Sequence, residues 1–84
     1  MIETNYSKIE FFLNKTIVPK YDYLRSISIN FYSGLNPQPY MIFHFNKRTP
    51  SIFQAESLME DVQNLVLQYF DVYMRAYYNN DRRD

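Results

Sequence analysis

The single histidine of the chain, His44, is the residue whose type could support acid–base chemistry. It lies in a segment that alternates polar and apolar residues, as does Ser28, and we expect the two side chains to lie opposite each other. A serine beside a histidine is the start of a nucleophile–base pair. No orienting acid follows at a suitable spacing, because Asp22 lies too far along its strand. We therefore interpret the pair as a hydrogen-bonded, half-exposed sheet contact and expect no enzyme.

Other chemistries that need particular residue types are excluded or weakly supported. The chain has no cysteine and one glycine, which excludes disulfides, thiolate metal ligands and a glycine-rich phosphate loop. The carboxylates of Glu56, Glu60 and Asp61 include one pair at i, i+4 spacing that could ligate a divalent cation. They fit the early turns of a helix more simply, because the helix dipole favours negative charge there. The sequence predicts no cofactor, no metal and no catalytic residue.

The charge composition argues against a dedicated nucleic-acid-binding protein. The 84 residues carry nine basic and nine acidic side chains, whereas affinity for nucleic acid rests on neutralising phosphates. The balance hides an asymmetry, because residues 1–50 hold six basic and three acidic residues and residues 51–84 hold three basic and six acidic. Two halves of opposite sign can pack on each other or on a second copy of the chain.

Aromatic residues make up 19% of the chain, with nine tyrosines and seven phenylalanines. Tyrosine offers a large contact area with a polar tip, and it is enriched at protein interfaces. An AT-rich coding sequence would produce the same composition, including the abundance of asparagine and isoleucine. The two interpretations do not exclude each other, and the first predicts a protein partner.

Three elements are predicted in the first half of the chain. Apolar residues at helical spacing predict a helix over about Thr4–Thr16, with Thr4 or Asn5 as its N-terminal cap. Period-two alternation with β-branched and aromatic residues predicts strands over Tyr21–Tyr32 and Tyr40–Asn46. The segment between the strands, 33–39, contains the only glycine and two prolines, which indicates a turn.

The two strands are expected to pair as an antiparallel hairpin in which Tyr32 lies opposite Tyr40. This register aligns apolar residues on one face, which holds Ile27, Ile29, Phe31, Met41, Phe43 and Phe45. The opposite face is polar and aromatic, as the solvated side of an antiparallel sheet should be. The residues that we expect to contact an outside partner there are Tyr32, Tyr40, His44 and Arg48.

One long helix is predicted over Thr49–Tyr78, opened by a threonine cap and a proline in the first turn. A competing interpretation keeps 50–53 extended and starts the helix at Ser51 or later, with Ser51 and Gln54 as a capping box. The long helix would span about 44 Å. A compact domain of this length is only about 30 Å across. The C-terminal part of the helix is therefore expected to extend beyond its own domain.

That overhanging part stays apolar, and exposed apolar surface of this extent usually marks an interface. We therefore expect a homodimer that packs through Tyr69, Phe70, Tyr73, Met74 and Tyr77. A two-stranded hairpin also leaves open strand edges, which offer a second route to association. The alternative is a monomer with a broken helix, in which the chain ends cover the edges.

The predicted fold is α+β in the order helix–strand–strand–helix, with both helices on the apolar face of the hairpin. It forms a single domain over 1–78, followed by a polar tail over 79–84. No apolar stretch reaches the roughly 18 residues that a membrane span needs, and no signal peptide is recognised, so we expect a cytoplasmic location in the producing cell or in a host cell.

The expected function is that of a small non-enzymatic module that binds a larger cytoplasmic protein and modulates or inhibits it. Its size and composition fit an accessory protein of a phage or mobile element. The alternative is a nucleic-acid-binding regulator that uses the polar face of the hairpin, where aromatic rings could stack on bases and basic residues could hold phosphate.

Overall fold

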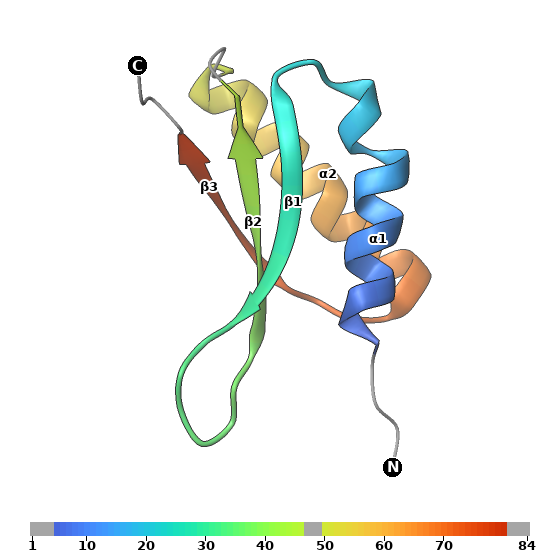
Figure 1. The fold of residues 1–84 in the computed structure, drawn as a ribbon, viewed down its shortest axis with the longest axis vertical. Coiled ribbons are helices and arrows are strands. Elements are labelled where there is room, and N and C mark those ends of the chain that lie inside the picture. The colour runs from blue at the N-terminus through green and yellow to red at the C-terminus, as the bar shows by residue number, and fades with distance from the viewer. Residues whose placement is uncertain (1–4, 47–49, 81–84) are drawn as a thin grey trace.

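A computed structural model describes residues 5–46 and 50–80 of the chain. These residues form helices and strands in the order α1 (Tyr6–Thr16), the short 3-10 helix η1 (Val18–Lys20), β1 (Leu24–Phe31), β2 (Pro39–Phe45), α2 (Ile52–Phe70) and β3 (Arg75–Asn80) (Figure 1). The predicted α+β class is confirmed. The predicted order helix–strand–strand–helix is wrong, because a third strand follows the second helix.

Helix α1 begins at a side-chain cap and packs through one apolar stripe. The side chain of Asn5 accepts a hydrogen bond from the backbone N–H of Lys8 at 3.2 Å, which satisfies one of the free donors of the first turn. Ile9 and Leu13 lie one turn apart and are both buried. The spacing of these residues therefore places the helix against the sheet, as the sequence predicts.

Strands β1 and β2 form the predicted antiparallel hairpin, but their register differs from the expected one by two residues. Tyr40 pairs with Asn30 rather than with Tyr32. Side chains alternate along a strand with period two, so a shift of two leaves the residues from Ser26 to Phe31 on their predicted faces. An irregularity between Leu24 and Ser26 places Leu24 in the core instead. Ile27 and Phe43, which pair with each other, are both buried, and this confirms the apolar face.

Helix α2 begins with a capping box. The side chain of Ser51 accepts a hydrogen bond from the Gln54 N–H at 3.2 Å, and the Ser51 N–H donates to Gln54 Oε1 at 3.1 Å. The capping box and the later helix start of the competing interpretation are therefore confirmed, but its extended segment is too long, because Ile52 and Phe53 are already helical. Pro50 precedes the helix, so its predicted place in the first turn is wrong, and Thr49 lies outside the described residues.

Helix α2 ends at Phe70, well before the predicted end at Tyr78. Asp71 adopts the left-handed conformation, with φ 58° and ψ 37°, and its N–H donates to the Leu67 carbonyl at 2.9 Å. A short polar side chain such as aspartate tolerates this conformation better than most residues do. The left-handed turn closes the helix and sends the chain back along the sheet.

The residues after this turn form β3, which pairs in parallel with β2. The sheet therefore has the order β1-β2-β3, with β2 at its centre. No helix extends beyond Phe70 within the described residues, so the overhang from which association was expected does not exist there, and any association needs another surface. Asn79 and Asn80 belong to β3, and residues 81–84 of the predicted tail lie outside the described residues.

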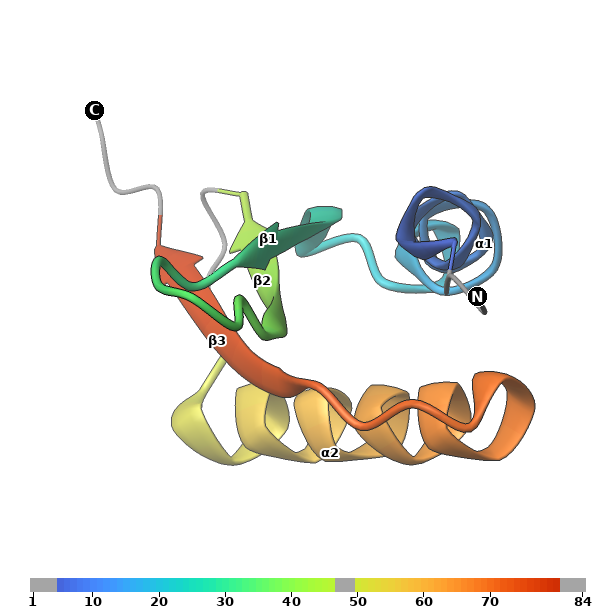
Figure 2. The same ribbon diagram turned by 90° about the horizontal axis from the view of Figure 1, so that it is seen from below.

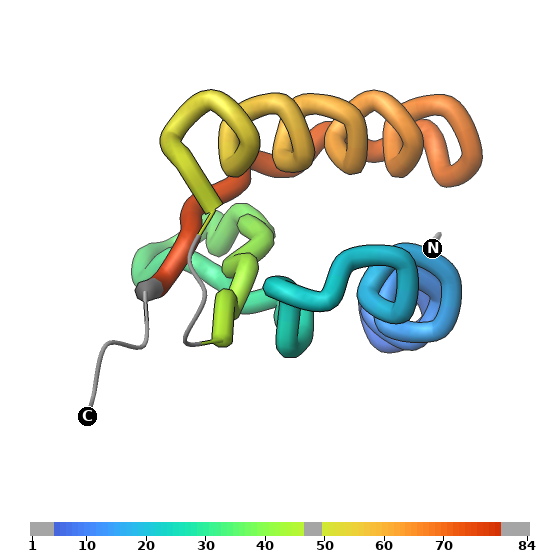
Figure 3. Tube along the Cα trace, turned by 90° about the horizontal axis from the view of Figure 1, so that it is seen from above, coloured from blue at the N-terminus to red at the C-terminus, as the bar shows by residue number. Residues whose placement is uncertain are grey.

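Both helices contribute to one hydrophobic core with the sheet. Its buried members are Ile9, Leu13, Leu24, Ile27, Met41, Phe43, Phe45, Ala55, Leu58, Val62, Val66 and Met74. Figure 2 shows α1 end-on and α2 lengthwise, and Figure 3 shows the same from the other side, so the helix axes cross steeply. Among the residues that the structure describes, no helix covers the opposite face of the sheet. We call this uncovered side the open face.

Candidate functional site

The open face carries polar and aromatic side chains from all three strands. Strands β1 and β2 contribute Ser26, Ser28, Asn30, Tyr40, Ile42 and His44. Parallel pairing places Arg75 beside Tyr40, and it places Tyr77 beside Ile42. Since paired residues point to the same side of a sheet, β3 adds a charge and a large ring to the surface that the hairpin begins.

Three tyrosines meet at one end of the open face, and we call them the tyrosine cluster: Tyr32, Tyr40 and Tyr77. The ring centroids of Tyr32 and Tyr40 are 4.5 Å apart, and those of Tyr40 and Tyr77 are 5.6 Å apart in an edge-to-face arrangement. The hydroxyls of Tyr32 and Tyr77 are hydrogen-bonded to each other. Residues that are 45 positions apart in the sequence thus form one preorganised aromatic surface.

The backbone of the β1–β2 connection holds Tyr32 in this cluster. Its N–H donates to the Gln38 carbonyl at 2.9 Å, which closes the turn just beyond the last strand pair. The Tyr32 side chain is 38% exposed and that of Tyr77 is 43% exposed. The backbone hydrogen bond therefore holds the cluster in place, while the rings of Tyr32 and Tyr77 stay accessible to a partner.

The hydroxyl pair is electrostatically asymmetric. The hydrogen bond with the Tyr32 hydroxyl lowers the pKa of Tyr77, and the nearby positive charge of Arg75 acts in the same direction. The same hydrogen bond raises the pKa of Tyr32. Either hydroxyl can donate in this hydrogen bond, and Arg75 makes this end of the face electropositive.

A shallow hollow lies beside the tyrosine cluster. It has a volume of about 380 Å³, and its lining residues are Tyr32, Gln38, Pro39, Tyr73, Arg75 and Tyr77. Tyr73, which is 62% exposed, forms its outer rim together with Arg75. A hollow bounded by tyrosines and one arginine can accept a side chain of another protein, because these residue types combine apolar contact with hydrogen bonding.

His44 lies at the other end of the open face. Its Nε2 atom is 2.8 Å from Ser28 Oγ, which confirms the predicted hydrogen bond, although His44 pairs across the strands with Ser26 rather than with Ser28. Burial lowers the pKa of His44, and the positive charge of Arg25 lowers it further. The imidazole is therefore neutral at neutral pH and serves as a hydrogen-bonding group on the surface.

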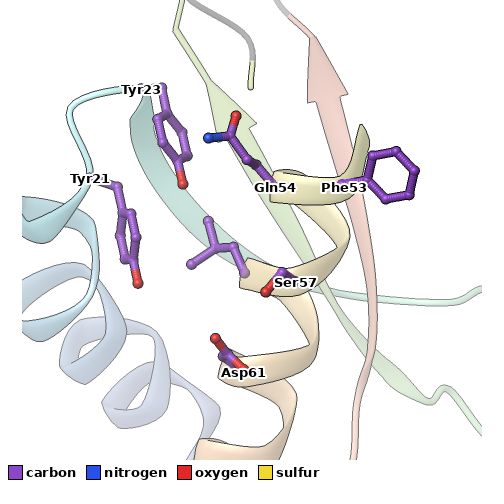
Figure 4. A pocket seen from close by; sticks show the side chains of 7 residues that line it. Tyr21, Tyr23, Phe53, Gln54, Ser57 and Asp61 are labelled. Atoms are coloured by element: carbon purple, nitrogen blue, oxygen red, sulfur yellow. The ribbon is translucent and has the colours of Figure 1, made fainter. Parts of the chain in front are cut away.

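A second hollow lies on the helix side of the molecule, between the segment before β1 and the first half of α2. It has a volume of about 270 Å³. Figure 4 shows Tyr21 and Tyr23 on one wall and Ser57 and Asp61 on the other, whereas the ring of Phe53 points away. The sequence carries no local signal for this hollow, because it arises only from how α2 packs beside the chain that leads into β1.

The structure separates the residues that were predicted for self-association. Phe70 and Tyr69 close the end of α2 and contact the ring of Phe12, at centroid distances of 5.5 and 6.1 Å. Met74 is 1% exposed and belongs to the core. Tyr73 and Tyr77 lie instead on the hollow of the open face. These five residues therefore do not form one helical stripe.

The predicted partner-binding residues lie closer together. Tyr32 and Tyr40 belong to the tyrosine cluster, and His44 lies on the same open face. Arg48 lies outside the described residues. The sequence analysis missed Arg75 because it assigned this segment to the helix. The alternation of apolar Val72, Met74 and Ala76 with Tyr73, Arg75 and Tyr77 was the signal that could have indicated a strand.

Comparisons of the chain with protein-family models, with curated proteins and with solved structures found no match. Within residues 5–46 and 50–80, no helix is long and apolar enough to cross a membrane. The same residues contain no group of three or more histidine, aspartate or glutamate side chains arranged to hold a metal ion. Functional inference for this chain therefore rests on its own surface.

Proposed function

We propose that the chain is a small non-enzymatic protein-interaction module that binds a larger cytoplasmic protein and modulates or inhibits it. The observation that supports this proposal is the meeting of Tyr32, Tyr40 and Tyr77 from different parts of the sheet on a face that no described helix covers. Arg75 and Tyr73 border the same surface. Tyrosine and arginine are the residue types most enriched, with tryptophan, at the energetic centres of protein interfaces.

The packing of the cluster favours binding for an entropic reason. Tyrosine has few rotatable bonds, and each ring of the cluster already contacts another ring, so little side-chain freedom remains to be lost on binding. The hollow beside the rings gives a partner side chain a place to insert. The residues that we assign to partner binding are therefore Tyr32, Tyr40, Tyr73, Arg75 and, at the far end, His44.

A homodimer is part of this proposal. The domain is small, contains no cysteine and relies on a single core, and small domains gain stability through association. Large apolar side chains remain exposed outside the open face, among them Phe11, Ile52 and Phe53, at 65%, 62% and 85%. Exposed side chains of this size are consistent with a second copy that covers part of the surface.

The alternative function is that of a nucleic-acid-binding regulator. One observation favours it: the charged residues within the three described strands are Arg25 and Arg75, both positive, and Arg75 lies on the open face with Tyr40 and Tyr77. Such a surface could stack bases and contact phosphates. Two arginines provide few phosphate contacts, and the rings of the cluster pack on one another, so we favour a protein partner.

The partner can be identified by affinity capture from the native cell with matched variants. Tyr32→Ala removes one ring of the cluster, whereas Tyr69→Ala removes an exposed tyrosine on α2 whose ring contacts that of Phe12 and, among the described contacts, touches no ring of the cluster. Truncation of a central interface residue costs about 2 kcal/mol, or a loss of about thirtyfold in affinity. We expect a protein that is retained by the wild type and by Tyr69→Ala but lost with Tyr32→Ala.

Two results of this capture experiment count against the proposal. Equal retention of every captured protein by all three forms would show that the tyrosine cluster binds none of them. Capture of nucleic acid that is released steeply by added salt would instead support the alternative, because counterion release makes such binding strongly salt-dependent. The folded state of both variants is checked by circular dichroism before capture.

A further inference from the structure

The two edges of the sheet differ in whether another part of the chain covers them. At the β1 edge, a side chain forms hydrogen bonds with the strand backbone. Asn14, on α1, donates from its amide nitrogen to the Ile27 carbonyl at 2.7 Å and accepts from the Ile27 N–H at 3.1 Å. These two hydrogen bonds mimic those of a neighbouring strand at the middle of β1. Covering an edge in this way prevents the pairing of that strand with another chain.

The outer edge of β3 has no such cover among the described residues. In Figure 1, α1 lies beside β1, whereas no described element lies beside the outer edge of β3. The strand contains one charged residue, Arg75, and two large rings, Tyr77 and Tyr78, which are 43% and 37% exposed. An uncovered edge with little charge and large aromatic side chains is a template for a further strand.

We propose that β3 pairs antiparallel with β3 of a second copy, with Tyr77 lying opposite Tyr77 of that copy. This inference deepens the homodimer of the proposed function and rests on it. An isologous pair of edges is related by a two-fold axis, and we place that axis at Tyr77, so that this residue lies opposite itself. The result is a continuous six-stranded sheet with β1 at each outer edge, where Asn14 ends further growth.

The side chains of β3 complement one another in this register. Ala76 lies opposite Tyr78 on the helix side, so a small residue faces a large one beside α2. Arg75 lies opposite Asn79, so no like charges meet, and it comes within diagonal reach of Tyr77 of the second copy, where a cation–π contact can form. The two Tyr77 rings meet on the open face, where no described helix limits their space.

The dimer also changes the partner-binding surface. Each tyrosine cluster extends to the Tyr77 ring at the edge of its own sheet, so pairing of the two edges joins both clusters across the two-fold axis. A partner then meets one aromatic surface twice the width of the surface on a single copy. Because the Tyr32 hydroxyl is hydrogen-bonded to Tyr77, the mass of Tyr32→Ala is measured by light scattering before its capture of a partner is interpreted.

Cysteine cross-linking tests the pairing, because the chain contains no cysteine of its own. Opposite residues of antiparallel strands have Cα atoms about 4.5–5.5 Å apart, which suits a disulfide. Under mild oxidation, Tyr77→Cys should form a covalent dimer within minutes. Leu35→Cys, which lies in the β1–β2 turn and is fully exposed, is the matched control and should remain monomeric on that timescale.

A second pair of variants keeps the test decisive if Tyr77→Cys folds poorly. Arg75→Cys and Asn79→Cys should cross-link with each other when mixed, and neither should cross-link alone, because each lies opposite the other residue of the second copy. Equal cross-linking of all variants, or none in any folded variant, would overturn the pairing.

Light scattering separates this inference from the proposed function. Wild-type protein should have a mass near twice 10.3 kDa at tens of micromolar. A mass near 10.3 kDa would overturn both the edge pairing and the homodimer, while partner capture with Tyr32→Ala would still decide partner binding on its own. A wild-type dimer combined with a folded Tyr77→Cys variant that fails to cross-link would overturn the edge pairing alone.

Discussion

Replacement of Asn14 by alanine should destabilise the fold more than the loss of a polar helix residue usually does. The change removes two hydrogen bonds to Ile27, at 2.7 and 3.1 Å, and leaves the N–H and carbonyl of a buried residue without their partner. A hydrogen bond contributes about 0.5–1.5 kcal/mol, and an unpaired buried group costs about 1–3 kcal/mol. We therefore expect the free energy of unfolding to fall by about 2–4 kcal/mol, from the roughly 5–15 kcal/mol of a typical domain.

Urea denaturation followed by circular dichroism measures this loss. The matched control is Asn64→Ala, because Asn64 is exposed on α2. Alanine raises the helix propensity equally in both variants, by up to about 0.7 kcal/mol, so this gain cancels in the comparison. The control should be unchanged or slightly stabilised. A difference between the two variants below about 0.5 kcal/mol would refute the reasoning, since it would show that Asn14 does not hold the β1 edge. Hydrogen exchange of the Ile27 amide should also accelerate in Asn14→Ala alone.

Three further predictions follow from the C-terminal half and from His44. Met74→Ala should lower the free energy of unfolding by about 2–5 kcal/mol because its side chain is 1% exposed, and no change in urea denaturation would favour an exposed helical position. Ser51→Ala should cost about 1 kcal/mol through loss of the capping box, and an unaltered midpoint would show that the helix is capped elsewhere. His44 has a lowered pKa in the folded chain, so its contribution to stability is complete above the unfolded value of about 6.5 and is lost as pH falls through the folded pKa. Denaturation between about pH 5.5 and 7 should therefore depend less on pH in His44→Gln, and an identical slope would contradict the shift.

The hairpin could be predicted from the sequence apart from its register. Alternation assigns each residue to a face, but a shift by two preserves every assignment, so the hydrophobic pattern cannot distinguish the two registers. The observed register depends on the backbone of the turn, where the Tyr32 N–H bonds the Gln38 carbonyl, and on an irregularity between Leu24 and Ser26. The turn hydrogen bond has no signal in the apolar pattern. The irregularity leaves only an indirect one, because apolar Leu24 lies three residues before Ile27 and breaks the period-two alternation.

The end of α2 could not be predicted by its usual markers. Neither glycine nor proline follows Phe70, and Asp71 takes the left-handed position that glycine commonly occupies. Apolar residues continue with helical spacing through Tyr73 and Ala76, so the helical pattern and the strand pattern overlap. Pairing with β2 selects the strand, because burial of Met74 and the ladder with β2 stabilise it.

The candidate site could be predicted only in its hairpin part. Tyr32 and Tyr40 share a polar face in either register, so their exposure follows from alternation alone. Tyr77 joins them because β3 returns beside β2, a tertiary event that local sequence does not encode. The sequence analysis placed Tyr77 on a helix for self-association, whereas the structure places its ring in the tyrosine cluster and its backbone at the open edge.

The claim that the tyrosine cluster binds a larger protein is tested most directly by photo-cross-linking in the native cell. A photoreactive phenylalanine analogue replaces Tyr32 in one variant and Tyr69, which is also exposed, in a control. The account predicts an adduct heavier than two copies of the chain from position 32 and none from position 69. The same adducts from both positions, or none from position 32 in a folded protein, would contradict it.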